Sequence, residues 1–274
     1  MDREHSANLP GFLGGVATGR RADYDRGMCG RAILTSPVED IAEAFGVSAI
    51  PIGPPRFNVA PGQDLVIVRA RPTTARELAI VRWGLVPWWS KDGPSSPRGC
   101  AGPKVGGRFV QARGETVATA PAFRDAFTSK RCLVIVDGFY EWSGTKGKAD
   151  RQPHRVRLAD GRPFAIAGVW DSWKAPDGSI LETCAVVTTA SRGPVAELHD
   201  RMPLVLDRAA RERWLTAPAA DARDLVAEPS PVELVVVPVS SWVNDVRHDD
   251  ARCLEPALPR EAAAPPRQTT LRFD

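Results

Sequence analysis

The chain has 274 residues, enough for one large domain or two small ones, and its formal net charge is only +3. Charged residues make up 25% and hydrophobic residues 43% of the sequence, which is typical of a soluble globular protein. The mild positive charge permits a local basic patch but does not by itself indicate binding to nucleic acid.

Several classes of protein are excluded at this stage. No run approaches the roughly 18 apolar residues that a membrane-spanning helix requires, so we expect no membrane partner. The sequence has no metal-ligand spacing, phosphate-binding loop or dinucleotide fingerprint, so we expect no metal and no cofactor. Five cysteines without a paired spacing indicate a reducing compartment, and the cytoplasm is the expected location. Cys132 and Cys184 lie in apolar runs and are expected to be inert core thiols.

The N-terminal stretch leads to the sequence Met28-Cys29-Gly30-Arg31. The 27 residues before Met28 make a poor signal peptide, because their apolar run is short and broken by glycine. We therefore expect residues 1–27 to be a disordered leader or the result of an upstream start codon. If Cys29 becomes the terminal residue, its α-amine and thiol form a 1,2-aminothiol, which condenses with aldehydes into a thiazolidine. An α-amine has a pKa of about 7.7–8.0, so a useful fraction is the neutral nucleophile.

The next stretch has the signals of a short helix. Ser36 is expected to be the N-cap, Pro37 the first helical residue, and Glu39 the residue that closes a capping box. Apolar residues then follow at helical spacing, and Gly46 is expected to end the helix.

Most of the remaining pattern predicts short strands. We expect strands at residues 64–69, 78–83, 131–136, 155–158, 164–173, 183–189 and 234–239. Short helices are expected at residues 121–127, 208–215 and 221–227. Residues 93–107 predict a Gly- and Pro-rich loop, and residues 257–274 predict a disordered tail. This pattern predicts an α+β fold: a single domain, residues 28–256, built on a largely antiparallel, barrel-like sheet with short flanking helices.

Three polar residues are candidates for chemistry. Glu141 lies among aromatic residues, and an apolar wall would favour a protonated carboxyl suited to general acid–base catalysis; alternatively, it is a strand-end residue that faces solvent. His199 lies in a polar turn, as a catalytic group or as a surface histidine. Arg113 could equally be a phosphate contact or part of a structural ion pair.

Trp88 and Trp89 are adjacent on a proline-bounded loop. Neighbouring side chains on an extended segment face opposite ways, so at least one should be exposed, unless both cap the core. An exposed tryptophan can stack on a base, which contributes about 1–3 kcal/mol in single-strand binders. Four basic residues surround the loop and could contact phosphate: Lys91, Arg98, Lys104 and Arg108.

Six motifs, taken together and in order, resemble the SOS response-associated peptidase (SRAP) family, whose members shield abasic sites. They are Met-Cys-Gly-Arg at 28–31, Arg-Phe-Asn-Val-Ala-Pro at 56–61, Trp-Gly-Leu-Val-Pro at 83–87, Ala-Arg-Gly-Glu-Thr at 112–116, Asp-Gly-Phe-Tyr-Glu-Trp at 137–142 and His-Asp-Arg-Met-Pro at 199–203. The resemblance covers residues 28–256.

The resemblance implies a function. Members of this family bind abasic sites in single-stranded DNA or at junctions between single and double strands. The amine of the terminal cysteine attacks the aldehyde of the opened sugar, and the thiol closes a thiazolidine, which leaves a stable crosslink. The implied partner is therefore single-stranded DNA that contains abasic sites. We expect the protein to act as a monomer, associated with the nucleoid when bound to DNA, with autopeptidase and lyase-type activity.

The resemblance also assigns catalytic roles. Cys29 would be the nucleophile, and Glu141 would shuttle protons. His199 would hold the hydroxyl of the opened sugar and assist Schiff-base formation. Asn58 would position the cysteine terminus, and Gln111 stands where the family usually has asparagine, with a side chain about one methylene longer. The leader and the long loop at residues 93–107 are further departures from the family pattern.

The resemblance assigns DNA contacts as well. Arg113 would grip a phosphate beside the lesion, and Trp88 or Trp89 would wedge against the stacked bases. Thr188 would line the pocket, and Pro61 is carried over with its motif as a DNA contact.

Two other functions stay open on the residues alone. One is a thiol peptidase that acts on other proteins through Cys29, His199 and Glu141, or through Cys29, His199 and Asn58. The other is a non-catalytic module that binds single-stranded DNA through Arg113 and the two tryptophans. Only abasic-site capture requires a free amine at Cys29.

Overall fold

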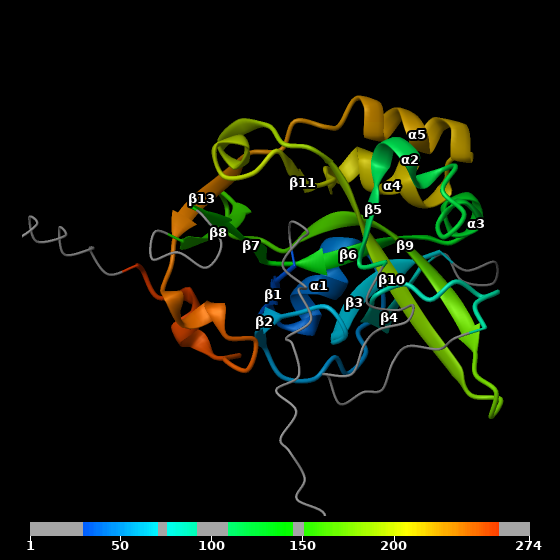
Figure 1. Ribbon diagram of the computed structural model, residues 1–274, viewed down its shortest axis with the longest axis horizontal. Coiled ribbons are helices and arrows are strands. Elements are labelled where there is room, and N and C mark those ends of the chain that lie inside the picture. Colours follow the sequence, from blue (N-terminus) through cyan, green and yellow to red (C-terminus); the bar gives the residue numbers. More distant parts are fainter. Residues whose placement is uncertain (1–29, 71–75, 92–108, 145–150, 258–274) are drawn as a thin grey trace, which may run out of the picture.

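Five strands close into a barrel, as Figure 1 shows for the computed structural model, which describes residues 30–70, 76–91, 109–144 and 151–257. The strands are β3 (Asp64–Arg69), β4 (Glu77–Trp83), β6 (Arg131–Val136), β9 (Phe164–Lys174) and β10 (Ile180–Ala190). They are paired in the order β10-β4-β3-β6-β9, and β10 pairs with β9 again, which closes the ring. Within the ring, β10 and β4 are parallel and the other pairs are antiparallel.

A second, antiparallel sheet packs against the barrel in the order β13-β8-β7-β1-β2. Its strands are β1 (Ala32–Leu34), β2 (Arg56–Val59), β7 (Gly138–Ser143), β8 (Gln152–Leu158) and β13 (Leu234–Pro238). Three short strands extend the barrel sheet: β5 (Gln111–Arg113), β11 (Arg201–Pro203) and β12 (Val205–Leu206). This single domain confirms the predicted α+β class with its largely antiparallel, barrel-like sheet.

The helices are short and lie outside the sheets. They are α1 (Val38–Phe45), α2 (Gly114–Val117), α3 (Arg124–Ser129), α4 (Arg208–Thr216) and α5 (Ala219–Ala227), with 3-10 turns η2 (Gly193–Glu197), η3 (Ser241–Asn244) and η4 (Ala251–Leu254). Helices α2, α3, α4 and α5 gather on one side of the barrel (Figure 1). None of the helices in the described part of the chain has the length and apolar character that a membrane crossing requires.

Alternation along the strands divides the core into two large clusters. On β6, Leu133 and Ile135 pack in one cluster with Trp214 of α4, whereas Val134 and Val136 pack in the other with Phe139 of β7. The barrel wall is therefore apolar on both faces, and it joins the helices to the second sheet. The buried free thiols of Cys132 and Cys184 also confirm their predicted place in the core.

Helix α1 begins differently from the prediction. Pro37 is the N-cap and no side chain caps the helix, so the predicted capping box at residues 36–39 is wrong. The hydroxyl of Ser36 instead donates to the buried carboxylate of Asp137 (2.6 Å), which also accepts from the Ser36 N–H (2.7 Å). The end of the helix is as predicted, with Gly46 in the left-handed region at φ 64°.

The other boundaries differ mainly where elements are short. The helix predicted at residues 121–127 begins at Arg124, and β8 begins earlier than predicted, at Gln152. Six short strands were not among the predicted elements: β1, β2, β5, β7, β11 and β12. The expected leader at residues 1–27 and the loop at residues 93–107 lie outside the described residues, as does the tail beyond Ala257.

The barrel wall depends on a glycine where three strands meet, and replacing it should lower stability. A Cβ on Gly168 would lie 2.9 Å from Sγ of Cys132 and 2.9 Å from Cγ2 of Val134. We expect Gly168→Ala to lower the free energy of unfolding by about 1–3 kcal/mol, measured by chemical denaturation, because neither buried neighbour has room to move. Ser172→Ala on the same strand is the control, with an expected change within about 0.5 kcal/mol. Equal stabilities of the two variants would contradict this account of the barrel wall.

Candidate functional site

Glu141 lies on β7 beside the first described residues of the chain. The N–H of Tyr140 donates to the carbonyl of Arg31 (3.0 Å), within the antiparallel pairing of β1 and β7. Glu141 is only 3% exposed, and its register partner on β8 is His154. Cys29 lies outside the described residues. The structure thus places the segment that follows Cys29 alongside the strand that carries Glu141, and the solvent-facing alternative for Glu141 is wrong.

Asn58 is fully buried on β2, and its amide holds two distant segments together. Its Oδ1 accepts from Nη1 of Arg31 (2.7 Å). Its Nδ2 donates to the carbonyls of Val243 (3.2 Å), Asp245 (3.0 Å) and His248 (2.7 Å). The Asn58 side chain therefore acts on the cysteine-bearing segment through Arg31, two residues after Cys29.

The C-terminal segment at residues 239–257, which we call the strap, is fixed over β2 by a carboxylate. Asp249 accepts hydrogen bonds from the main-chain N–H groups of Phe57 (2.5 Å) and Asn58 (2.8 Å) and from Nε of Arg56 (2.5 Å). β2 is the edge strand of its sheet, so on this side no neighbouring strand is available to its N–H groups. The strap thus takes the place of a further strand beside β2.

Two aromatic residues of β7 tie the strap to the same region. The hydroxyl of Tyr140 donates to the carbonyl of Phe57 on β2 (2.8 Å) and lies 3.5 Å from the carbonyl of Cys253 in the strap. Nε1 of Trp142 donates to Oδ1 of Asn244 in the strap (2.7 Å). Burial raises the pKa of Tyr140, so its hydroxyl remains a donor at any physiological pH. The guanidinium of Arg31 lies over the Trp142 ring, 5.8 Å from its centroid. Glu141 therefore lies between Tyr140 and Trp142, whose side chains are fixed by hydrogen bonds to β2 and to the strap.

A second cluster of candidates forms at one end of β10. Thr188 of β10 is buried and faces Arg113 of β5 in the parallel register. Arg201 of β11 donates to the Thr188 carbonyl (2.9 Å) and hydroxyl (3.2 Å) and to both carboxylate oxygens of Glu115 (2.8 Å each). Arg113 is exposed at the end of its strand. The cluster thus presents two guanidinium groups next to one buried hydroxyl.

Local geometry explains why this cluster is tight. A Cβ on Gly114 would clash with Val226 of α5 and would lie 3.1 Å from the Thr188 carbonyl, so glycine allows α2 to pack directly on β10. The hydrogen bonds from Arg201 lower the pKa of Glu115, which therefore stays ionised and keeps Arg201 in place.

His199 lies in the turn between η2 and β11, and 37% of its side chain is exposed. Its Nδ1 lies 2.6 Å from a carboxylate oxygen of Asp200 and 3.2 Å from the main-chain nitrogen of Arg201. Nδ1 accepts from the Arg201 N–H in one tautomer and donates to Asp200 in the other, so it is the ring nitrogen that faces these two neighbours. Val195 and Met202, on either side of the turn, are buried and anchor it to the core.

Gln111 and Pro61 lie apart from each other, on β5 and in the turn between β2 and β3. Gln111 begins β5, opposite Val186, and its buried Nε2 has no hydrogen-bond partner in the described part of the chain. Pro61 is half-buried in the tight turn between β2 and β3, directly before Gly62, whose φ is 86°. The assignment of Gln111 and Pro61 to the site stays a prediction.

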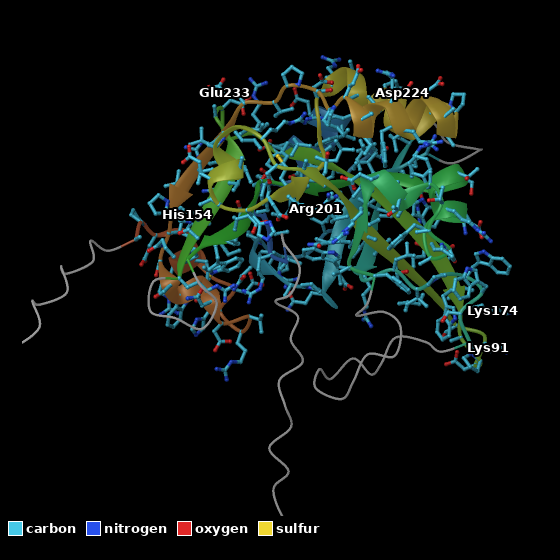
Figure 2. All side chains as sticks on the ribbon, turned by 45° about the horizontal axis from the view of Figure 1, so that its top comes forward. Lys91, His154, Lys174, Arg201, Asp224 and Glu233 are labelled. Carbon is cyan, nitrogen blue, oxygen red and sulfur yellow. The ribbon has the colours of Figure 1, made fainter. Side chains whose placement is uncertain are left out.

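Trp88 and Trp89 lie on a separate turn after β4, and both are exposed, by 58% and 48%. The alternative in which both cap the core is wrong. Lys91, which follows this turn, lies on the other side of Arg201 from His154 (Figure 2). Of the basic residues around the loop, Arg98, Lys104 and Arg108 lie outside the described residues.

The structure thus brings the candidates together in two groups on one scaffold. Phe139 beside Glu141 and Val186 beside Thr188 belong to the same hydrophobic cluster, which also contains Val195 and Met202 next to His199. Sequence reasoning did not single out Arg201 or Asp249. Arg201 lies inside a matching motif, and that position was the available signal; Asp249 had none, because its partners are about 190 residues away.

The described residues offer few alternatives to these candidate sites. They contain no group of three or more His, Cys, Asp and Glu side chains that could hold a metal ion. A groove of about 900 Å³ is lined by residues of β1, α1 and β3 and by the segment at residues 51–56, and it contains neither Glu141 nor Thr188.

Comparison with known proteins places this architecture in a family. The family model described as SOS response associated peptidase (SRAP) matches residues 28–246. The abasic site processing protein YoqW of Bacillus subtilis (strain 168) is 34% identical over 234 residues, which span 83% of this chain and 99% of that protein. The abasic site processing protein HMCES of Mus musculus is 26% identical, over 74% of this chain and 65% of that protein. The chain belongs to the SOS response associated peptidase (SRAP) family.

Solved structures agree on the fold. A crystal structure of a protein from Bacteroides thetaiotaomicron superposes with a TM-score of 0.71 at 20% identity and covers 84% of this chain and all (100%) of that chain. A second, from Bordetella bronchiseptica, has a TM-score of 0.60 at 28% identity and covers 77% of this chain and 100% of that chain.

The contacts of Asp249 predict that the strap is energetically important. In Asp249→Ala, two main-chain donors of β2 lose their acceptor, and each buried donor left unpaired costs about 1–3 kcal/mol. We expect the free energy of unfolding to fall by about 2–4 kcal/mol. Asp250→Ala is the matched control, because the exposed Asp250 bonds only within the strap, to Arg252 and Trp242, and should cost much less. Equal losses in a denaturant titration would mean that the strap does not depend on Asp249.

The environment of His154 predicts a pH dependence. Burial lowers the pKa of His154 below its ordinary value of 6.5. Between the two pKa values, the imidazole is therefore protonated in the unfolded chain and neutral in the folded protein. Stability should therefore decline as the pH falls below about 6.5 and level off below the folded pKa. His154→Gln should remove part of this slope in denaturation curves measured between pH 7.5 and 5.5. An unchanged slope would assign the pH dependence to other groups.

Proposed function

We propose that this protein captures abasic sites in single-stranded DNA covalently, through a thiazolidine formed by Cys29 as the N-terminal residue. The observation that carries the proposal is the family match over residues 28–246, which begins at the Met-Cys pair, with relatives named abasic site processing proteins. The buried Glu141 next to the segment that follows Cys29 supports the same chemistry.

The proposed reaction is balanced without a cofactor. The neutral α-amine of Cys29 attacks the aldehyde of the opened sugar, and loss of one water gives a Schiff base. The thiol of the same residue then adds to the imine carbon, its proton passes to the nitrogen, and a five-membered ring closes. Two carbon atoms separate the amine from the thiol, so ring closure needs no movement of the protein.

Four residues besides Cys29 would serve this reaction: Glu141, His199, Asn58 and Gln111. Glu141, buried on a rigid strand, would give a proton to the leaving hydroxyl and take one during ring closure. His199 would hold the hydroxyl of the opened sugar through its Nε2. Asn58 would position the cysteine terminus through Arg31, and Gln111 would use its unpaired amide N–H groups toward the lesion.

A second set of residues would hold the DNA: Arg113, Thr188, Pro61, Trp88 and Trp89. The exposed Arg113 would contact a phosphate beside the lesion, and Thr188 would line the pocket beneath it. Pro61 would contact the strand at the rim. Trp88 and Trp89 would stack on or wedge against the neighbouring bases, at about 1–3 kcal/mol for each base.

Finer aspects of the function belong to the same proposal. The working unit is the domain at residues 28–256, acting as a monomer at the nucleoid in response to DNA damage, with residues 257–274 as a tail. A translation start at Met28 followed by loss of that methionine, or autoproteolysis of the leader, would expose the amine of Cys29. Elimination from the Schiff base, with loss of a C2′ proton and departure of the 3′-phosphate, would give lyase-type cleavage of the DNA strand.

The proposal requires a free α-amine on Cys29, and this requirement can be tested directly. A chain that begins at Cys29 should give an adduct with an oligonucleotide that contains one abasic site, and the adduct should survive denaturing electrophoresis. The 274-residue form, with Cys29 inside the chain, should give at least tenfold less. Intact mass should show the loss of one water on adduct formation, because the Schiff base forms by condensation.

Two controls separate this proposal from its alternatives. Acetylation of the Cys29 amine should abolish the adduct, whereas a peptidase that relies on the thiolate would keep its activity. Cys29→Ala should bind DNA but give no thiazolidine; if it forms the same stable adduct, the proposed nucleophile is wrong. If no form of the chain gives an adduct but all bind DNA in a salt-sensitive way, the protein is a non-catalytic DNA-binding module.

A further inference from the structure

The turn that carries Trp88 and Trp89, which we call the tryptophan turn (residues 86–90), exposes two large apolar side chains at adjacent positions. Exposed indoles lower their free energy by folding back on the protein unless the backbone holds them out. The tryptophan turn is followed by Lys91, which lies near Lys174 at the end of β9 (Figure 2). Specific contacts to the backbone of the turn must therefore keep both rings exposed.

Three hydrogen bonds from the barrel fix the backbone of the tryptophan turn. The buried hydroxyl of Thr183 accepts from the N–H of Val86 (2.8 Å) at its start. Nε1 of Trp173 donates to the carbonyl of Ser90 (2.8 Å) at its end. The third bond is at its centre, where the N–H of Trp88 donates to a carboxylate oxygen of Asp171 (2.8 Å).

Asp171 is the unusual member of this set, because its side chain is a charged group in the barrel wall. It is only 2% exposed, and its other carboxylate oxygen accepts from Nζ of Lys130 (2.5 Å) and from the N–H of Ser172 (2.8 Å). Burying a carboxylate is costly unless it is paired and fully hydrogen-bonded, and here each oxygen has its donors. A neutral acceptor would bind the Trp88 N–H at a smaller desolvation cost, so the charge indicates a demand for a stiff anchor.

The ring of Trp88 is tied as well as its backbone. Its Nε1 lies 3.4 Å from a carboxylate oxygen of Asp125 on α3. One edge of the indole is thus directed toward α3, while 58% of the residue stays exposed. Lys130, which follows α3, connects the same helix to Asp171.

We infer that Asp171, with Lys130, is a positioning residue for DNA binding, which holds the tryptophan turn in its stacking conformation before DNA arrives. The inference rests on the proposed function, in which the two tryptophans stack on bases. Since the turn is already ordered, binding loses little conformational entropy, and the stacking contacts appear in full as affinity. The carboxylate oxygens of Asp171 bond to Trp88, Lys130 and Ser172, so we expect Asp171 to affect the concentration dependence of capture and not its rate at saturation.

The test compares Asp171→Ala with Asp171→Asn in the chain that begins at Cys29. Asp171→Ala removes the acceptor of the Trp88 N–H and should raise the half-saturating concentration of an abasic oligonucleotide roughly tenfold, with the crosslinking rate at saturation within twofold of the parent. Asp171→Asn keeps one carbonyl oxygen for that N–H and should recover most of the affinity. The control is Asp160→Ala, in an exposed turn, which should match the parent. All are compared well below the melting temperature of each variant.

A double-mutant cycle separates positioning from a general structural role. In a Trp88→Ala, Trp89→Ala background, Asp171→Ala should have no further effect on the half-saturating concentration, because the rings that it positions are gone. An effect of the same size in both backgrounds overturns the inference, and so does an unchanged affinity in Asp171→Ala. If Asp171→Ala does not fold, Thr183→Val, which removes the acceptor of Val86, is measured in its place with the same criteria.

Failure of the inference is distinct from failure of the proposed function. If the parent chain forms the denaturation-resistant adduct while Asp171→Ala binds with unchanged affinity, only the positioning role of Asp171 is wrong. If the parent chain forms no adduct, the proposed function itself is wrong, and the cycle on DNA affinity still reports whether Asp171 acts through the tryptophans.

Discussion

The buried amide of Asn58 is the contact on which the arrangement of the site depends. It accepts from Arg31 near the start of the described chain and donates to strap carbonyls 185 to 190 residues later in the sequence. An amide buried without such partners would cost about 1–3 kcal/mol, so neither segment can leave without a penalty from the other. Since Arg31 follows Cys29 by two residues, the placement of the proposed nucleophile is coupled to the far end of the domain.

The two packed sheets explain why this coupling can be precise. Glu141 lies on β7 of the second sheet and Thr188 on β10 of the barrel, both among buried neighbours, and side chains on such strands are held more exactly than side chains on loops. The two groups of candidates share one hydrophobic cluster, in which Phe139 and Val186 take part. The buried side chains of this cluster thus connect the surroundings of Glu141 with those of Thr188.

Local signals and distant contacts differ in how far the sequence reveals them. The end of α1 follows from Gly46 alone, since a left-handed residue there needs no partner elsewhere. The start of α1 does not, because Asp137, 101 residues away, takes the hydroxyl that would have capped it. The succession of short strands with few helices predicted the barrel-like sheet. The roles of Arg201 and Asp249 become visible only when the fold brings each of them to its partners.

The charges of the site divide its work in a way that fits the small net charge of the chain. The side chain of Arg201 is only 15% exposed and is neutralised by Glu115, so it orders the pocket around Thr188 more than it attracts DNA. The exposed Arg113 forms no ion pair within the described part of the chain and would supply the attraction to phosphate. In the proposed function, exposed groups (Arg113 and the tryptophan turn) would provide the affinity for DNA, and buried groups such as Glu141 would carry out the chemistry. Such a protein needs no strongly basic surface, because the proposed covalent bond, once formed, would make the equilibrium strength of the initial DNA contacts less important.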